Sequence, residues 1–278
     1  MIVSQQKIKE FQKFIFVWWR KNRRDLPWRQ TYDPYKIMVS EVMLQQTQVD
    51  RVLTRYTEFI QTYPTVTDLA KAKVSDILRL WKGMGYNRRA LYLKKAAEAI
   101  LEVYKGVFPA SEQALLKLSG IGTYTARAIL VFSFKQDSAM VDTNIRKIIT
   151  HFFFHDEKQP EKVIQEVADQ LVPKGKSWEW HQALMDFGAI ELSRELKVHK
   201  VYKVHKGIKS KPFKETNRFF RGRMMDFVRE KNWKQEKLIR VMVKQHGKDI
   251  PFYEKIIEDL LQEGLLTRSS RAIISLPE

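Results

Sequence analysis

The chain has 278 residues and carries 50 lysines and arginines against 32 aspartates and glutamates, a formal net charge of +18 at pH 7. Its apolar fraction of 44% is enough to build real hydrophobic cores and excludes a disordered basic tail. The chain has no cysteine, which excludes disulfides, cysteine-ligated zinc and cysteine-held iron–sulfur clusters, and its six histidines show no metal-ligand spacing. We therefore expect no metal and no cofactor. The excess positive charge predicts a polyanionic partner, because basic side chains that neutralise phosphates release counterions.

The N-terminal segment mixes polar and apolar residues at helical spacing and lacks the apolar stretch of a signal peptide. Apolar runs such as 128–131 are far too short to span a bilayer. We therefore expect no membrane association and a cytoplasmic, nucleoid-associated location.

Apolar residues recur at three-to-four spacing along most of the chain, with Pro, Gly, Asp or Ser between the runs. This period is typical of amphipathic α-helices. It predicts helices over 5–21, 34–46, 48–61, 66–71, 74–81, 87–104, 111–117, 123–134, 143–153, 160–171 and 178–190. The chain up to residue 190 is thus predicted to be all-α.

The helix expected at 34–46 is apolar nearly all round, which predicts that it is buried, and Glu41 interrupts its apolar surface. Burial disfavours the charged form of a carboxyl group and raises its pKa, so Glu41 is a candidate proton donor near neutral pH. The alternative is an ion pair with an arginine such as Arg29. The amides of Gln45, Gln46 and Gln48 cluster just beyond and suit either hydrogen bonds to bases or plain helix-terminal positions.

Two glycines separate amphipathic runs in the stretch Leu-Ser-Gly-Ile-Gly-Thr-Tyr-Thr-Ala at 118–126. This spacing suggests a tight hairpin between two helices, since glycine adopts a positive φ without a Cβ clash. The unpaired amides of such a hairpin suit a phosphate oxygen. Gly120, Gly122, Thr123 and Thr125 are therefore candidates for binding a nucleic-acid backbone, and the alternative is an ordinary connection between two helices.

Asp142 follows two apolar residues and opens a helical run, so it is well placed to be an N-cap. A capping carboxylate beside a cleft is also a fixed anion, and an anion near a sugar stabilises an oxocarbenium-like centre. Glu41 and Asp142 would then be an acid and its electrostatic partner, with Asn144 near enough to assist.

Beyond the predicted helices, residues 193–214 hold eight basic residues and one glutamate, a net charge of +7. We interpret this segment as a basic connector. Lys200, Lys203 and Lys206 recur every third residue, which favours either contacts to a DNA backbone or a solvated stripe.

Residues 215–278 have the element order of a winged-helix-like module. Helices are expected at 215–230, 235–246 and 251–262, followed by two short strands around a Ser-Ser turn. The helix at 251–262 would occupy the recognition position, but Glu254, Glu258 and Asp259 make it a poor reader of a DNA groove. The module could instead be structural or bind protein.

Taken together, the sequence resembles the helix-hairpin-helix DNA glycosylases, and within them the adenine glycosylases of the MutY type. The resemblance covers roughly residues 5–190 and rests on an ordered series of motifs. These include Leu-Pro-Trp-Arg and Ser-Glu-Val-Met-Leu-Gln-Gln-Thr-Gln-Val, and they occupy 26–29, 33–35, 40–49, 59–64, 80–86, 108–109, 118–126 and 141–144.

The resemblance implies catalytic roles for four residues. Glu41 matches the acid that protonates the adenine ring, and Asp142 matches the carboxylate that stabilises the sugar cation. Tyr124 falls where bifunctional relatives carry a Schiff-base lysine, which implies a monofunctional enzyme in which Tyr124 and Asn144 support the intermediate.

The resemblance also implies residues that meet the bases. Gln46, Thr47 and Tyr86 match residues that fill the duplex around a flipped base, and Arg29 lies in a stretch that lines the base pocket. The pair Gln45-Gln46 favours adenine.

Two features depart from the resembling family. Its members usually carry four cysteines after the segment corresponding to 185–190, which bind an iron–sulfur cluster, and this chain has none. Members that recognise 8-oxoguanine carry a larger β-rich C-terminal domain, which 215–278 does not resemble.

We therefore expect an all-α, two-lobed helix-hairpin-helix core with a small C-terminal winged-helix-like α+β module. The expected domains are a core at 1–192, a connector at 193–214 and the module at 215–278. Within the core, one six-helix lobe would span about 26–134, and 1–25 with 135–192 would form the second.

The expected activity is that of a monomeric, monofunctional base-excision-repair glycosylase acting on double-stranded DNA with a mismatch or lesion, with adenine opposite guanine or 8-oxoguanine as the leading substrate. The alternatives are a thymine or uracil glycosylase acting on mismatches with guanine, and a non-catalytic DNA-binding protein. The presence of both Glu41 and Asp142 argues against the last, since binding alone needs no buried acid.

Overall fold

The structure, a computed structural model, describes residues 2–192 and 212–278. Contacts divide the chain into two units: Met1–Glu41 with Phe108–Lys206, and Val42–Val107 with Gly207–Glu278, each as far as its residues are described. The boundary at residue 41 falls inside a helix. This division differs from the lobes expected at 26–134 and at 1–25 with 135–192, because the helix after the hairpin packs against helices of the first unit.

The first unit is helical throughout its described part. Its elements are α1 (Gln5–Asn22), the 3₁₀ turn η1 (Pro27–Arg29), most of α2 (Pro34–Leu44), α7 (Glu112–Leu115), α8 (Thr123–Phe134), α9 (Thr143–Phe154), α10 (Glu161–Leu171), α11 (Ser177–Phe187) and the π-helical turn η2 (Gly188–Leu192). These bounds lie within a few residues of the predicted ones.

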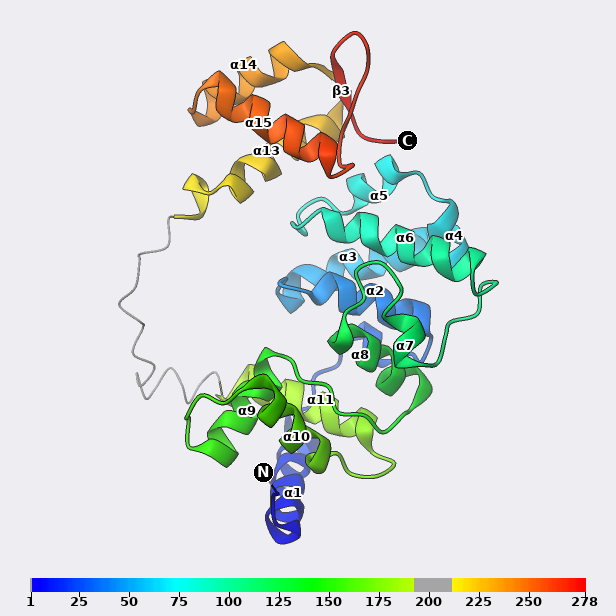
Figure 1. The fold of residues 1–278 in the computed structure, drawn as a ribbon, viewed down its shortest axis with the longest axis vertical. Coiled ribbons are helices and arrows are strands. Elements are labelled where there is room, and N and C mark those ends of the chain that lie inside the picture. Colours follow the sequence, from blue (N-terminus) through cyan, green and yellow to red (C-terminus); the bar gives the residue numbers. More distant parts are fainter. Residues whose placement is uncertain (1, 193–211) are drawn as a thin grey trace. The chain divides into compact units, whose positions relative to one another are not determined.

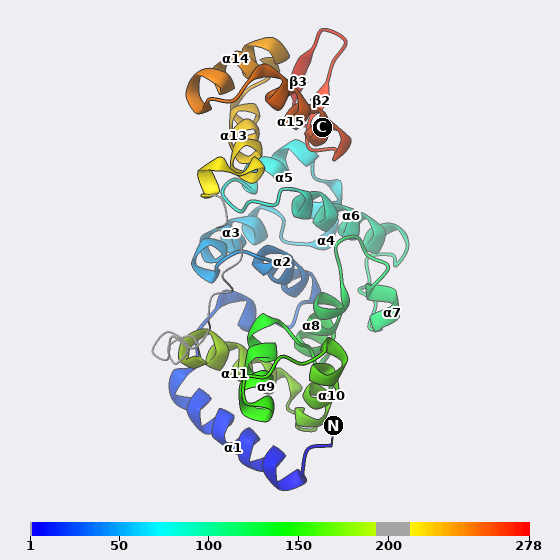
Figure 2. The same cartoon turned by 60° about the vertical axis from the view of Figure 1, so that its left-hand side comes forward.

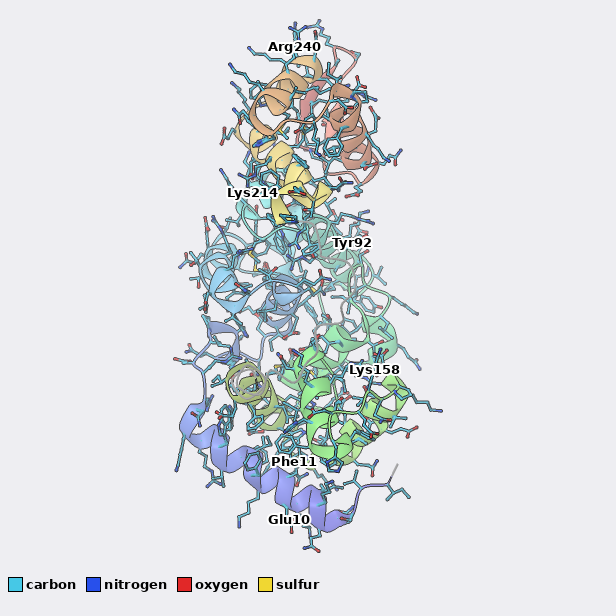
Figure 3. All side chains as sticks on the ribbon, turned by 90° about the vertical axis from the view of Figure 1, so that its left-hand side faces the viewer. Glu10, Phe11, Tyr92, Lys158, Lys214 and Arg240 are labelled. Carbon is cyan, nitrogen blue, oxygen red and sulfur yellow. The ribbon has the colours of Figure 1, made fainter. Side chains whose placement is uncertain are left out.

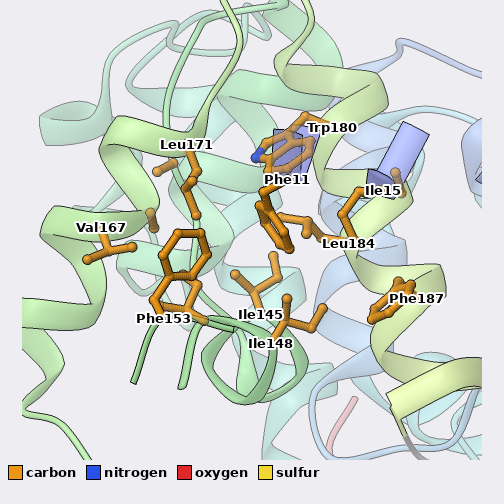
Figure 4. Packing of buried hydrophobic residues seen from close by; sticks show 14 of the residues in the cluster. Phe11, Ile15, Ile145, Ile148, Phe153, Val167, Leu171, Trp180, Leu184 and Phe187 are labelled. Atoms are coloured by element: carbon orange, nitrogen blue, oxygen red, sulfur yellow. The ribbon is translucent and has the colours of Figure 1, made fainter. Parts of the chain in front are cut away.

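The core of this unit forms where the apolar stripe of α1 meets α9, α10 and α11 (Figure 4). Apolar residues spaced three to four apart along α1 place Phe11 and Ile15 on one face, and Ser4 caps the helix by accepting a hydrogen bond from the Lys7 amide. The ring of Phe11 packs against Phe153 and Trp180, with centroids 5.1 and 5.8 Å away. This packing fixes α11 and α9, which carry site residues described below.

The second unit begins at Val42 in the last turn of α2 and continues through α3 (Val49–Thr62), α4 (Val66–Lys71), α5 (Val74–Leu80) and α6 (Arg88–Glu102). Helices α4 and α6 lie side by side (Figure 1). Helix α2 ends at Leu44 and not at the predicted 46, because Gln46 has a φ of 55°, which is incompatible with the right-handed helix.

The C-terminal module contains α13 (Asn217–Glu230), β1 (Trp233–Lys234), α14 (Gln235–His246), α15 (Ile250–Gln262), β2 (Thr267–Arg268) and β3 (Ile273–Ser275), after the 3₁₀ turn η3 (Phe213–Glu215). The strands pair antiparallel in the order β1-β3-β2 (Figure 2). The predicted winged-helix-like module is thus confirmed. Its β1 was not predicted, because a two-residue strand has no detectable alternation.

Two acidic residues of α15 are engaged within the module. Glu258 pairs with Arg268, and Asp259 lies 3.9 Å from Arg221. A helix whose carboxylates face its own module fits a structural position better than the groove of a polyanion.

Lys200, Lys203 and Lys206 of the basic connector lie outside the described residues, so their phosphate contacts stay a prediction. Among the described helices, none is both long enough and apolar enough to cross a membrane.

Candidate active site

The hairpin predicted between α7 and α8 is present. Gly120 has a φ of 76°, a left-handed conformation that glycine adopts without strain. Gly122 is the N-cap of α8 with a φ of −94°, so its backbone does not require glycine, and a Cβ built there would meet no described atom within 4 Å. No side chain in the described part of the chain caps α8. The end of α8 therefore offers exposed amides and space for a ligand backbone.

The four hairpin candidates do not share one environment. Gly120, Gly122 and Thr123 are exposed, whereas Thr125 is buried on the inner face of α8 with 3% of its surface accessible. The first three lie where a phosphate could reach them.

Tyr124 lies on the first turn of α8 and donates a hydrogen bond from its hydroxyl to the carboxylate of Glu41. Glu41 projects from α2 among apolar neighbours on the same helix, such as Met38 and Val42, and only 6% of its surface is accessible. The buried carboxylate predicted from the apolar helix is therefore observed. The alternative, an ion pair between Glu41 and Arg29, is not observed. Glu41 interacts with Tyr124, and Arg29 pairs with Asp186.

Burial raises the pKa of Glu41 from its ordinary 4.5 to about 7. The hydrogen bond from Tyr124 lowers this pKa, and the negative charge of Asp142 raises it further. Near neutral pH a large fraction of Glu41 is therefore protonated and can donate its proton.

Asp142 is the N-cap of α9, and its carboxylate accepts hydrogen bonds from the Ile145 amide at 2.7 Å and from Asn144 Nδ2 at 3.3 Å. Burial raises the pKa of Asp142, although these donors and the charge of Lys147 oppose the shift. The predicted capping role is thus observed. The same bonds hold the carboxylate at a fixed position beside Glu41.

Two further contacts position this carboxylate and its neighbour. Met140 donates its amide to Nε2 of the buried His181 at 3.2 Å, while His181 Nδ1 lies 2.7 Å from the Ser177 carbonyl. Burial lowers the pKa of His181 to about 4, which keeps the ring neutral and able to accept. A Cβ built on Gly188 would lie 2.7 Å from the Cβ of Asn144, so glycine permits their close approach.

Arg29 is buried and bound to Asp186. Its Nη1 and Nη2 each lie 2.8 Å from a carboxylate oxygen of Asp186, and its Nη1 also donates to the Arg24 carbonyl. With 6% of its surface accessible, this guanidinium joins η1 to α11. Its base-pocket role stays a prediction.

In the second unit, the turns that carry Gln45, Gln46, Thr47 and Tyr86 are held by Arg89. Its Nη1 donates to the carbonyls of Val42, Met43 and Gln45, and its Nη2 donates to Thr47 Oγ1 and to the carbonyls of Met84 and Gly85. Gln46 and Tyr86 both have left-handed backbones, with φ of 55° and 46°, and both side chains are exposed. Arg89 thus stabilises two strained turns that present side chains outward.

Sequence reasoning missed His181, Asp186, Gly188 and Arg89. Each acts through a partner distant along the chain, and a lone histidine, aspartate or arginine on a helical stretch gives no local signal. Gly188 had a weak signal, since a glycine inside a predicted helix lowers helix stability and can mark a close packing contact.

The chain does not fit the iron–sulfur cluster of the resembling family. Such a cluster is held by cysteine thiolates, and the chain has none. Within the described ranges, no three His, Asp or Glu side chains gather in a way that could hold a metal ion.

The first-unit cluster can do acid and electrostatic chemistry. A neutral carboxylic acid at Glu41 can protonate a leaving group, and a fixed carboxylate at Asp142 can stabilise positive charge that develops nearby. Two carboxyl groups with different surroundings are suited to different tasks.

Comparisons with known proteins show which family of proteins this chain is similar to. Residues 39–174 match the model of the HhH-GPD superfamily of base excision DNA repair proteins. The chain is 36% identical over 191 residues to the thymine/uracil-DNA glycosylase of Methanothermobacter thermautotrophicus, which covers 67% of this chain and 86% of that protein. It is also 36% identical over 183 residues to an adenine DNA glycosylase of Buchnera aphidicola, covering 65% of this chain but only 52% of the relative.

The fold has matching solved structures. A thermostable thymine-DNA glycosylase has 35% sequence identity and a TM-score of 0.63, and the match covers 66% of this chain and 87% of that one. A non-covalent endonuclease III–DNA complex, at 19% identity and a TM-score of 0.58, shares the fold.

Proposed function

The chain belongs to the HhH-GPD superfamily of base excision DNA repair proteins, and from this premise we propose that it is a monofunctional DNA glycosylase that removes a mispaired adenine. The observation that carries the proposal is the buried Glu41, whose pKa of about 7 makes it a proton donor at physiological pH. Thr123 and the hairpin glycines would bind the DNA backbone through exposed amides.

In the proposed reaction, the carboxylic acid of Glu41 donates its proton to a ring nitrogen of an adenine extruded from the duplex. The N-glycosidic bond breaks, its electron pair leaves with the protonated base, and the sugar becomes an oxocarbenium ion. Water adds to C1′ and gives a proton to the carboxylate that the first step left at Glu41, which restores the acid and yields an abasic site and free adenine.

Asp142 would act while the sugar carries positive charge. Its carboxylate is held by the Ile145 amide and by Asn144, so it need not reorganise when the cation forms. Tyr124 would hold the Glu41 carboxyl group in place and stabilise the carboxylate that proton transfer leaves behind, since its hydroxyl donates to that group.

Adenine is the leading substrate because of leaving-group chemistry. Its ring nitrogens are basic and gain from a proton donor with a pKa near neutrality, whereas the carbonyl oxygens of thymine and uracil are much weaker bases. Removal of a mispaired thymine or uracil is the second candidate, favoured by the thymine/uracil glycosylase that the chain matches over 86% of its length.

A glycosylase assay on a panel of duplexes tests both candidates. The panel holds A·G, A·8-oxoG, T·G and U·G pairs and a fully paired control, and alkali reveals the abasic product under single-turnover conditions. We expect product from the adenine mismatches. Product from T·G and U·G alone would establish the second candidate, and no product from any duplex would contradict the proposal.

Monofunctional chemistry has a separate test. β-Elimination requires an amine that forms a Schiff base with the sugar, and Tyr124 cannot supply one. We expect an abasic site with an unbroken strand before alkali treatment. Trapping of the wild-type protein on DNA by borohydride would contradict this assignment.

A further inference from the structure

The helices of the winged-helix-like module differ in charge. From Lys231 to Lys248, across β1 and α14, the chain holds six lysines and arginines against one glutamate, a net charge of +5. Helix α15 holds one lysine against three carboxylates, a net charge of −2. The two helices pack against each other through buried apolar residues, so their charged side chains lie outside the module core. The α14 side of the module is therefore basic.

Three basic residues lie on one face of α14. Lys237, Arg240 and Lys244 are spaced three and four apart, and the other side of the helix is buried at Leu238 and Met242. The three basic side chains are exposed, and Arg240, labelled in Figure 3, lies at the outer surface of the module. Lys237, Arg240 and Lys244 form the α14 basic face.

The module does not neutralise this face. Within residues 2–192 and 212–278, no carboxylate forms an ion pair with Lys237 or Lys244. Arg240 pairs with Glu236, one turn earlier on α14, but the two side chains are 74% and 77% exposed, so water screens the pair. A polyanion that approaches α14 therefore meets uncompensated positive charge.

The position of these lysines disfavours the helix that carries them. Like charges spaced three and four apart on a helix repel each other. Lys234, the N-cap, and Lys237, in the first turn, lie at the positive end of the helix dipole, and Lys234 makes no side-chain hydrogen bond to the first turn. By contrast, Thr216 and Asp249 cap α13 and α15 by accepting from backbone amides. Folding alone does not account for the lysines of α14, which favours a role in binding.

Helix α13 also carries arginines, but they are engaged with other groups of the second unit. Arg221 pairs with Glu263, and the buried Arg229 donates to the Leu78 carbonyl at 2.8 Å. Together with other arginines they line a cavity of about 830 Å³ inside this unit. Among the helices of the module, α14 is thus the one that presents its positive charge outward.

We propose that the α14 basic face binds phosphates of the DNA backbone, so that the module holds a duplex with α14 and not with α15, the helix in the recognition position. The net negative charge of α15 repels DNA, whereas lysines are point charges that suit phosphates without reading bases. Lys237 and Lys244 lie about 10 Å apart along the helix axis, so they can meet different phosphates of one duplex. The proposal rests on the DNA binding that the proposed function requires.

The test measures the affinity of the full chain for a fully paired duplex of about 30 base pairs, roughly three helical turns, over a range of salt concentrations. Wild type is compared with Lys237→Gln, Lys244→Gln and the double variant. Lys255→Gln is the matched control, because Lys255 is an exposed lysine of α15 and its loss removes the same charge from the same module. Glutamine and lysine have similar helix propensities, so these changes leave the helices intact.

Each lost phosphate contact should make the slope of log affinity against log salt shallower by about 0.9. We expect this loss in each single α14 variant, about twice as much in the double variant, and none in Lys255→Gln. At about 0.1 M salt, each lost contact should weaken binding roughly 5- to 10-fold. Lys237→Arg should keep the wild-type slope, since it keeps the charge that meets the phosphate.

Glu236→Gln tests the face in the opposite direction. This change releases Arg240 from its ion pair and removes the single carboxylate of α14. Affinity should therefore rise, and the slope should become steeper by up to about 0.9. A variant that merely disturbs the module cannot produce such a gain.

An unchanged slope in the double variant would overturn the proposal and leave the face to solvent or to an acidic protein. An equal loss of slope in Lys255→Gln would also overturn it, because it would show a general effect of net charge. These measurements need no excision. The expected slopes with no product in the glycosylase panel would contradict only the proposed function, and product with an unchanged slope would contradict only the role of α14.

Discussion

Two carboxyl groups of the first unit are buried almost equally, yet their surroundings shift their pKa values in opposite directions. Asp186, with none of its surface accessible, accepts hydrogen bonds from Trp19 Nε1, from the Arg24 amide and side chain, and from both terminal nitrogens of Arg29. Glu41, with 6% accessible, accepts from the Tyr124 hydroxyl and feels the negative charge of Asp142.

The pKa values follow the neighbours. Burial alone would raise the pKa of Asp186, but the donors and charges of Arg29 and Arg24 more than offset it and hold that pKa below its ordinary value. Nothing comparable opposes burial at Glu41, so its pKa rises to about 7. Asp186 is thus a permanent anion that fastens α1 and η1 to α11, whereas Glu41 can exchange a proton.

Among variants that test the contrast between Glu41 and Asp186, we expect the largest effect from Glu41→Gln. The amide keeps the shape and polarity of the acid but cannot donate a proton, so single-turnover base release should fall by roughly 10²- to 10⁴-fold. Affinity for the mismatched duplex should change little, as measured by titration with a non-cleavable analogue. A variant that releases base at a near-normal rate would remove Glu41 from the mechanism.

Asp186→Ala should act on stability, because it leaves the Arg29 guanidinium buried without its partner. Breaking a buried ion pair in this way costs about 3–5 kcal/mol, measurable by urea unfolding. Asp76→Ala is the control, since Asp76 pairs with Arg79 at 2.9 Å on the surface and should contribute at most about 1 kcal/mol. Equal losses in the two variants would contradict the structural role of Asp186.

Asp142→Asn separates capping from catalysis. Asparagine caps a helix about as well as aspartate, so the free energy of unfolding should stay within a few tenths of a kcal/mol. Base release should still fall by roughly 100-fold or more, because the charge that stabilises the sugar cation is lost. Unchanged activity would mean that capping is the whole role of Asp142.

The smallest expected effect is a pH-dependent gain in stability for Glu41→Gln. The folded state raises the pKa of Glu41 from 4.5 to about 7, so wild type is stabilised by the proton below pH 4.5 and loses that contribution as the pH rises towards 7. The variant avoids this loss. Its advantage in unfolding free energy should be small at pH 5 and reach up to about 3 kcal/mol at pH 8.

This stability difference is measured by urea unfolding of both proteins at the two pH values. The titration of His181, whose pKa of about 4 destabilises the fold as the pH falls below its ordinary 6.5, is common to both proteins and cancels. A difference that does not change with pH would show that burial of Glu41 does not shift its titration.

The sequence by itself determined the features that depend on near neighbours. The helices could be placed from their period, the left-handed turn at Gly120 from the glycine spacing, and the N-cap at Asp142 from its position before a helical run. Backbone conformation and capping involve residues within about four positions of one another, so the local pattern carries the information. The apolar surroundings of Glu41 on its own helix also predicted its burial.

Only the tertiary structure decided which charges meet. Arg29 could have paired with Glu41, but it binds Asp186, 157 residues away, and this choice leaves Glu41 with a raised pKa. Arg218 stacks on Tyr86 across 132 residues, which places the module beside an arginine-lined cavity. Ion pairs and pKa shifts depend on distance and burial in space, and no local pattern specifies either for residues so far apart along the chain.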